Sequence, residues 1–381
     1  MLPTIKKKCA VGALLMLSLL MSYTVTPIAS AQEAKPPTPP TGAAISPDGE
    51  VQTPSFIVPF SAFASKEAEA AFIAIGGTHT APPPMTDMAA VRRFYAKLAE
   101  DGAAKLRARY PVEIEDSRMG GMPVRIVRPV GAQGHNTPRV LICLHGGAFM
   151  WGELIEAEVE SVAIANASGI DVIGVDYREA PEHPFPDAVD DVLAVYRELL
   201  KTHAPQSIGI YGGSAGAILT GETVAALIDR GLPVPAAIGL FNGGIADATG
   251  DSIYWTGPLT GAPPLQPLVV QGAMRALEHP YFGGANLQSF LAFPASDPAR
   301  LKGFPPTLLL SGTRDFMLSS VLYSERQLSR AGVPTELHVW DGLWHTAFGH
   351  AELSETQEMI RFTADFFSNH LTVPPRAEGT R

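Results

Sequence analysis

The chain has 381 residues, of which 46% are hydrophobic and 17% are charged, and its formal net charge at pH 7 is −10. This composition is typical of a globular protein and excludes a disordered chain or a coiled coil. Its 36 glycines follow no three-residue period, which excludes a collagen-like chain. Because the net charge is negative, the chain lacks the basic footprint of a nucleic-acid-binding protein, and we expect no such partner.

The first 31 residues have the pattern of a secretory signal peptide. Lysines at 6–8 precede an apolar run at 10–21, and the small residues at 29–31 precede Gln32. The apolar run is shorter than the roughly 20 residues that span a membrane, which favours export over a membrane anchor. We therefore expect cleavage before Gln32 and a periplasmic or secreted protein without a stable membrane span.

After this segment, the composition divides the chain further. Residues 32–55 are rich in proline and predict an extended linker, and residues 56–110 carry helical patterns. Strand and helix patterns then alternate over 111–242 and 307–381. The expected strands are Val112–Glu115, Val124–Arg128, Val140–Leu144, Asp171–Val175, Ser207–Tyr211, Ala237–Phe241, Thr307–Ser311 and Glu336–Trp340. The clearest later helices are Asp187–Leu200, Gly216–Asp229, Ser319–Ser329 and Ser354–Asn369. The middle strands are almost continuously apolar, which indicates a parallel sheet covered by helices on both faces, in a doubly wound α/β domain.

Residues 243–306 interrupt this alternation. They contain many glycines and prolines, but also seven large aromatic side chains, which argue against disorder. We predict an insertion that packs over one end of the sheet, together with residues 56–110. The alternative is an additional structural layer without a role in the site.

A glycine-flanked serine follows the expected strand Ser207–Tyr211. The sequence Gly-Gly-Ser-Ala-Gly at 212–216 has the G-x-S-x-G pattern and opens the expected helix Gly216–Asp229. In this strand–turn–helix context the pattern predicts a nucleophile elbow, in which a sharp turn exposes the serine at the helix N-terminus. Ser214 is therefore the candidate nucleophile.

A second glycine pair follows the strand Val140–Leu144, in the sequence His-Gly-Gly-Ala-Phe at 145–149. Bare glycines allow backbone N–H groups to approach a substrate oxygen. With the elbow present, we predict an oxyanion hole formed by Gly146, Gly147 and Ala215 rather than a simple turn.

A nucleophilic serine needs a base, and the base needs an acid that orients it. In a fold with this elbow the chain order is serine, acid, histidine. Asp315 and His345 follow the last two expected strands and are the predicted acid and base. His338, inside a strand, His350, toward the last helix, and Asp341 are the alternatives.

These motifs together resemble the hormone-sensitive-lipase-like group of α/β-hydrolases. The resemblance includes His-Gly-Gly-Ala-Phe, the sequence Asp-Tyr-Arg-Glu-Ala-Pro-Glu at 176–182, Pro-Phe-Pro at 184–186 and the elbow, and it extends roughly over 123–370. It implies an α/β-hydrolase fold with a mostly parallel eight-stranded sheet and a helical cap. It also implies carboxylic ester hydrolysis by a triad of Ser214, Asp315 and His345. One departure is Gly213, because most members carry aspartate immediately before the nucleophile.

The expected substrate is a small ester of short or medium acyl chain, or a compact aromatic ester. Candidate side chains for an apolar pocket, or for ordinary core packing, are Phe149, Met150, Trp151, Phe316, Met317 and Trp344. No histidine spacing typical of a metal site occurs, and no phosphate-binding loop, so we expect neither metal nor cofactor. An amidase or peptidase with the same triad, or a non-catalytic binding protein on this fold, remains as the alternative.

Overall fold

The computed structural model describes residues 42–47, 49, 51–52, 57–78, 82–131, 138–248, 250–256 and 279–372. The chain divides into two compact units, Met1–Val58 and Pro59–Arg381. In the described part of the first unit, strands β1 (Ala44–Ile45) and β2 (Val51–Gln52) pair antiparallel. The predicted signal peptide and most of the linker lie outside the described residues.

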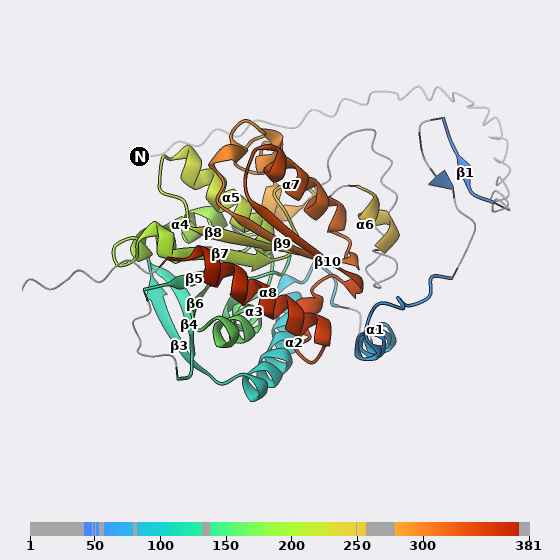
Figure 1. The fold of residues 1–381 in the computed structure, drawn as a ribbon, viewed down its shortest axis with the longest axis horizontal. Coiled ribbons are helices and arrows are strands. Elements are labelled where there is room, and N and C mark those ends of the chain that lie inside the picture. Colours follow the sequence, from blue (N-terminus) through green and yellow to red (C-terminus); the bar gives the residue numbers. More distant parts are fainter. Residues whose placement is uncertain are drawn as a thin grey trace, which may run out of the picture. The chain divides into compact units, whose positions relative to one another are not determined.

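The described residues of the second unit contain one eight-stranded sheet in the order β10-β9-β8-β7-β5-β6-β4-β3 (Figure 1). Its strands are β3 (Val112–Met119), β4 (Met122–Pro129), β5 (Val140–Leu144), β6 (Asp171–Val175), β7 (Ile208–Gly213), β8 (Ala237–Phe241), β9 (Thr307–Arg314) and β10 (Thr335–Trp344). The pairs from β6 to β10 are parallel, and β3 and β4 are antiparallel at one edge. The predicted mostly parallel sheet is therefore confirmed, including all eight strands.

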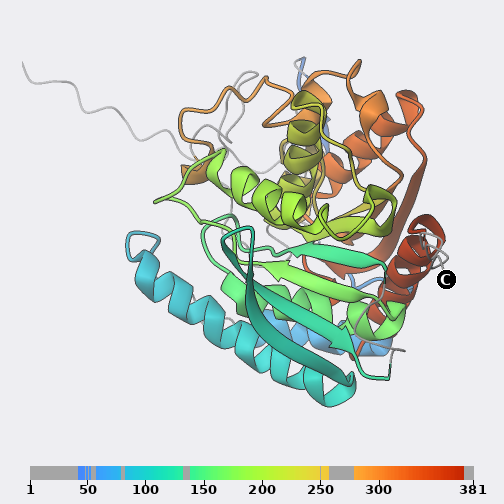
Figure 2. The same ribbon diagram turned by 90° about the vertical axis from the view of Figure 1, so that its left-hand side faces the viewer.

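Helices cover both faces of this sheet (Figure 2). They are α1 (Lys66–Thr78), α2 (Met88–Arg109), α3 (Glu153–Ser168), α4 (Asp187–Leu199), α5 (Ala215–Asp229), α6 (Asp251–Thr256), α7 (Leu318–Arg330) and α8 (Ser354–His370). The core on one face includes α4, α5 and α7, and the core on the other includes α3 and α8. The long helix α2 packs against α3.

The last two strands are longer than the sequence pattern indicates. β9 extends to Arg314 and β10 to Trp344, with a register shift between Trp340 and Trp344. Gly342 supplies the positive φ of 79° in this irregular stretch, a conformation that glycine adopts without strain. As a result His345 follows directly on the strand, at the sheet edge where the carboxyl ends of the parallel strands meet.

The described part of the insertion 243–306 packs against α5 and the loop after β5. It holds α6 and the 3₁₀ turns Pro280–Phe282, Pro294–Ser296 and Leu301–Gly303. Tyr281 is fully buried, stacks on Phe149 with ring centroids 3.7 Å apart, and donates a hydrogen bond to Glu222 Oε2 in α5 at 2.7 Å. A cap role for this insertion stays a prediction.

The N-terminal helical segment reaches the loop that follows β5. In α2, Arg92 Nε donates to the Met150 carbonyl at 2.9 Å, and the Tyr95 ring stacks on Trp151 with centroids 4.3 Å apart. The start of α2 is thereby tied to the loop that carries the predicted oxyanion donors. The expectation that residues 56–110 belong to a cap likewise stays a prediction.

Candidate active site

Ser214 lies at the turn between β7 and α5. Its backbone has φ 54° and ψ −118°, a strained conformation for a residue with a side chain. The flanking glycines make this turn possible, because Cβ atoms on Gly212 and Gly216 would lie 2.3 Å and 1.7 Å from the Leu144 carbonyl oxygen. The predicted elbow is therefore present, and it places Ser214 at the N-terminus of α5.

His345 joins Ser214 to Asp315. Its Nε2 lies 2.9 Å from Ser214 Oγ, and its Nδ1 lies 2.7 Å from Asp315 Oδ1. The Phe316 ring tilts against the imidazole with centroids 4.1 Å apart. The structure thus brings together all three residues of the predicted triad from three different strand ends.

The Asp315 carboxylate is fully buried and held by several donors. Oδ2 accepts from Asn242 Nδ2 at 2.6 Å and from Ser311 Oγ at 2.7 Å, and Oδ1 also accepts from the Met317 N–H at 2.9 Å. Burial alone would raise the pKa of Asp315, but the charge and hydrogen bond of His345, with those of the other donors, hold this pKa below its usual value. The carboxylate is therefore ionised at neutral pH and positioned to orient the imidazole.

The alternative acid and bases lie in other surroundings. Asp341 accepts a hydrogen bond from Thr313 Oγ1 at 2.9 Å, and His350 Nδ1 lies 3.2 Å from Glu352 Oε1. His338 lies within β10 and stacks on a phenylalanine ring of α8 with centroids 4.1 Å apart. The structure pairs none of these three with the serine of the elbow.

The expected oxyanion hole needs one correction. The Gly146 N–H donates to Glu160 Oε1 at 2.8 Å, so it is occupied and the prediction for this residue is wrong. Among the described residues, no acceptor is hydrogen-bonded to the N–H groups of Gly147, Ala148 or Ala215. Gly147 and Ala215 therefore remain candidate donors, and the geometry adds Ala148 as a third.

Several predicted pocket side chains are packed in the core. The four that are at most 6% exposed are Phe149, Met150, Met317 and Trp344. Phe149 stacks on Tyr281, whereas Trp344 contacts Phe72 on the other face of the sheet. Trp151 is partly buried against Tyr95, and Phe316 adjoins the imidazole. A direct role in substrate binding stays a prediction for all six.

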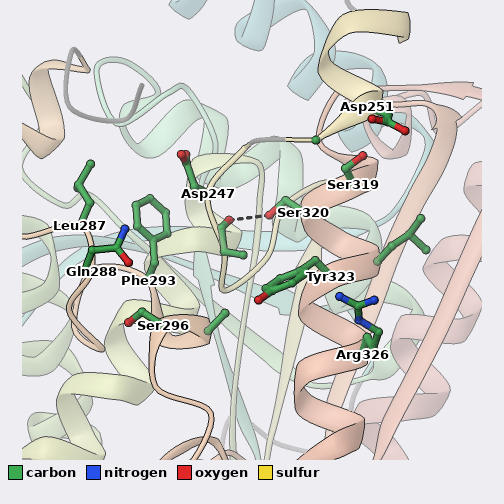
Figure 3. A pocket seen from close by; sticks show the side chains of 14 residues that line it. Asp247, Asp251, Leu287, Gln288, Phe293, Ser296, Ser319, Ser320, Tyr323 and Arg326 are labelled. Atoms are coloured by element: carbon green, nitrogen blue, oxygen red, sulfur yellow. Dashed lines mark hydrogen bonds between the residues drawn. The ribbon is translucent and has the colours of Figure 1, made fainter. Parts of the chain in front are cut away.

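A large cavity of about 750 Å³ lies beside α7 (Figure 3). Side chains from residues 246–251, 287–296 and α7 line it, and Ser320 Oγ in its wall donates to the Ala246 carbonyl at 2.6 Å. No triad residue is among its lining residues. The cavity is therefore separate from the hydrogen-bonded chain of Ser214, His345 and Asp315.

Two absences concern the described residues alone. They contain no group of three or more histidine, cysteine, aspartate or glutamate side chains arranged to hold a metal ion. None of their helices is both long and apolar enough to cross a membrane.

The sequence pattern did not reveal three residues that shape this site. Asn242 and Ser311 bind the acid of the triad, and Glu160 binds the loop after β5. Asn242 directly follows a buried strand, a position that could have marked it. Nothing in the sequence distinguishes Glu160 from the neighbouring glutamates of α3.

The sequence of this chain is similar to those of known hydrolases. The family described as having the alpha/beta hydrolase fold matches residues 141–349. An acetyl-hydrolase from Streptomyces hygroscopicus is 30% identical over 242 residues, which cover 63% of this chain and 77% of that protein. An esterase from Acinetobacter venetianus is 25% identical over 252 residues, covering 64% of this chain and 81% of that protein.

Solved structures show the same likeness. The crystal structure of an esterase from the bacterial hormone-sensitive lipase family has a TM-score of 0.69 and 29% identity, covering 81% of this chain and 99% of that one. The esterase E25 has a TM-score of 0.68 and 29% identity, covering 84% and 99%. The chain therefore belongs to the α/β-hydrolase family, in its hormone-sensitive-lipase-like group. It is a carboxylic ester hydrolase, as the motifs predicted.

Proposed function

We propose that this esterase is an exported serine hydrolase that cleaves esters of short or medium acyl chain, or compact aromatic esters, through an acyl-enzyme. The observation that carries the proposal is the continuous chain from Ser214 Oγ through the His345 imidazole to the ionised Asp315, with distances of 2.9 Å and 2.7 Å. This is the arrangement that nucleophilic acyl transfer requires.

In the proposed reaction, Ser214 Oγ attacks the ester carbonyl carbon while His345 Nε2 takes the hydroxyl proton. The negative charge on the carbonyl oxygen is stabilised by the N–H groups of Gly147, Ala148 and Ala215. The tetrahedral intermediate collapses, and the imidazolium gives its proton to the departing alkoxide. A water molecule then attacks the acyl-enzyme by the same route, which releases the acid and restores the serine. Asp315 keeps the imidazole in the required tautomer throughout.

Packing around the loop after β5 supports a compact substrate. The buried Phe149 ring stacks on Tyr281 and packs edge to face against Phe282, both from the insertion. These contacts cover the ring, so a long acyl chain cannot pack against it. The acetyl-hydrolase relative, by its name, removes a two-carbon acyl group.

We therefore expect catalytic efficiency to depend on acyl length with an early maximum. Each buried methylene contributes about 0.8 kcal/mol, or roughly a fourfold gain in kcat/KM, until the pocket is filled. The measurement is kcat/KM for p-nitrophenyl esters from two to sixteen carbons, with the matched p-nitroanilides as the amide comparison. A steady rise through the long esters would contradict a closed pocket, and faster anilide than ester hydrolysis would indicate an amidase.

Export rests on the sequence of the first 31 residues. We expect the protein purified from its native host to begin at Gln32, because the small residues at 29–31 are the type that signal peptidase accepts. Intact-mass spectrometry and N-terminal peptide mapping test this. A chain that retains Met1 in that material would contradict export by this signal.

A further inference from the structure

The side chain of Glu160 connects the two backbone segments on which the proposed reaction depends. Glu160 is on α3, is 5% exposed, and accepts the Gly146 N–H on Oε1 at 2.8 Å and the Gly213 N–H on Oε2 at 3.1 Å. Gly146 begins the loop with the candidate donors at 147 and 148, and Gly213 directly precedes the nucleophile. A single carboxyl group thus links the loop after β5 to the elbow after β7.

The surroundings of this carboxyl group argue on energetic grounds against a role in packing alone. Burial, together with the negative charge of Glu156, raises the pKa of Glu160 well above its usual value, and no lysine or arginine among the described residues offsets this. Burying even a neutral carboxyl group is costly unless its polar atoms are hydrogen-bonded. Its hydrogen bonds to the two backbone segments are the compensation that the structure offers.

The absence of a side chain at Gly213 leaves room for this carboxyl group. A Cβ atom on Gly213 would lie 3.1 Å from Glu160 Oε2 and 2.5 Å from Phe348 Cζ. A side chain at position 213, where the resembling enzymes carry aspartate, would therefore clash with the Phe348 ring and press closely against Glu160 Oε2. The glycine and the glutamate are geometrically coupled.

We propose that Glu160 is a positioning residue that holds the oxyanion loop, residues 146–148, and the nucleophile elbow at their working separation. Its carboxyl group reaches from α3 into the space beside residue 213. The proposal rests on the proposed function of Ser214 and its oxyanion donors. These donors come from two different strand ends, so the hydrogen bonds of Glu160 fix how they converge on one oxygen.

The first test compares Glu160→Leu and Glu160→Gln with wild type. Glutamine keeps one acceptor oxygen and leucine keeps none, so kcat should fall about 10-fold and about 100-fold, respectively, the range in which misplaced oxyanion donors act. KM should change less than about threefold. Rates are expressed per active site, counted by fluorophosphonate titration, so that misfolded protein does not count as slow enzyme.

Glu156→Gln is the matched control, because Glu156 lies one turn earlier on α3 and, within the described residues, its carboxyl group accepts no hydrogen bond. We expect its kcat to stay within about twofold of wild type. If Glu160→Leu keeps its kcat per titrated site, or Glu160→Gln is no better than leucine, Glu160 has no positioning role and the proposal is overturned. Turnover by Ser214→Ala at a rate close to wild type would instead refute the proposed function.

An exchange tests the coupling with residue 213. In a Phe348→Leu background, which gives the new side chain space, Gly213→Asp alone and Glu160→Leu alone should each lower kcat. Combined, they should recover at least about fivefold over Glu160→Leu, because one carboxyl group is again beside the elbow. A double variant no faster than Glu160→Leu would overturn the claim that the two positions share this space.

Discussion

Ser214→Ala should lose esterase turnover by a factor of about 10³ to 10⁶, the range measured when such a nucleophile is removed. Alanine keeps the elbow intact but leaves the carbonyl carbon without an attacking oxygen. The residual rate would come from water attack assisted by the oxyanion donors. The measurement is kcat on a short p-nitrophenyl ester, together with labelling by a fluorophosphonate that wild type should take up at Ser214 alone.

Ser320→Ala provides the control for this experiment. Ser320 is also buried, but it lies in the wall of the large cavity beside α7 and donates to the Ala246 carbonyl. We expect its turnover and labelling to stay close to wild type. Labelling that persists in Ser214→Ala, or a large loss in Ser320→Ala, would move the chemistry away from the elbow.

The predictable part of this fold is the part with regular periodicity. The buried strands β5 to β8 were anticipated within a residue or two, because each is a short, almost continuously apolar run that is followed directly by a polar residue. The elbow was predictable for a similar reason, since the strand, the G-x-S-x-G sequence and the helix are contiguous. Local sequence therefore contains all that is needed to locate Ser214.

Helix α3 shows why the support of the site was harder to predict. It packs against the sheet, α2 and α8, and its buried residues include Glu158, Glu160 and Ser161 as well as apolar ones. A helix enclosed on several sides has no single apolar stripe for periodicity to detect. The hydrogen bond from Gly146 to Glu160 joins residues on separate elements, and for this reason the sequence suggested a free N–H where the structure has an occupied one.

The ends of β9 and β10 illustrate a second limit. Beyond Ser311 and Trp340 the strands continue through glycine and polar residues, and β10 shifts register before Trp344. Irregular pairing depends on the neighbouring strand rather than on an alternating pattern. The order of acid and base along the chain nevertheless predicted the pair Asp315 and His345, which the structure brings together with Ser214.

Replacing Asp315 with asparagine should lower the plateau of kcat/KM by about 10⁴, or about 5.5 kcal/mol of transition-state stabilisation. The carboxylate is surrounded by donors, from Asn242, Ser311 and the Met317 N–H, so an amide NH₂ group must face some of them or turn toward His345. In the second case it donates to Nδ1 and leaves the proton on Nε2. The imidazole then cannot accept the proton of the nucleophile.

The pH dependence separates the acid from the base. An imidazolium cannot take the serine proton, so kcat/KM of wild type should rise with pH and level off once the base is neutral. His345 and the other donors around Asp315 hold the pKa of its carboxyl group below the usual value. The carboxylate is therefore already ionised over this pH range, and its titration adds no further rise or fall to the pH–rate profile. His345→Gln should remove both the rising limb and most of the activity.

Thermal unfolding of each variant should be measured alongside its rate. Because the pKa of Asp315 is lower in the folded state than its ordinary value, the ionised carboxylate stabilises the fold above about pH 4. This contribution is lost as the pH falls through the folded pKa, and it is absent from Asp315→Asn.

Asp341→Asn is the matched control, because Asp341 accepts from Thr313 at the same sheet edge without contacting the imidazole. It should keep its rate within about twofold, as should His338→Gln and His350→Gln. If instead His350→Gln abolishes activity while His345→Gln retains it, His345 is not the catalytic base. The proton would then not pass along the hydrogen bond between His345 and Ser214.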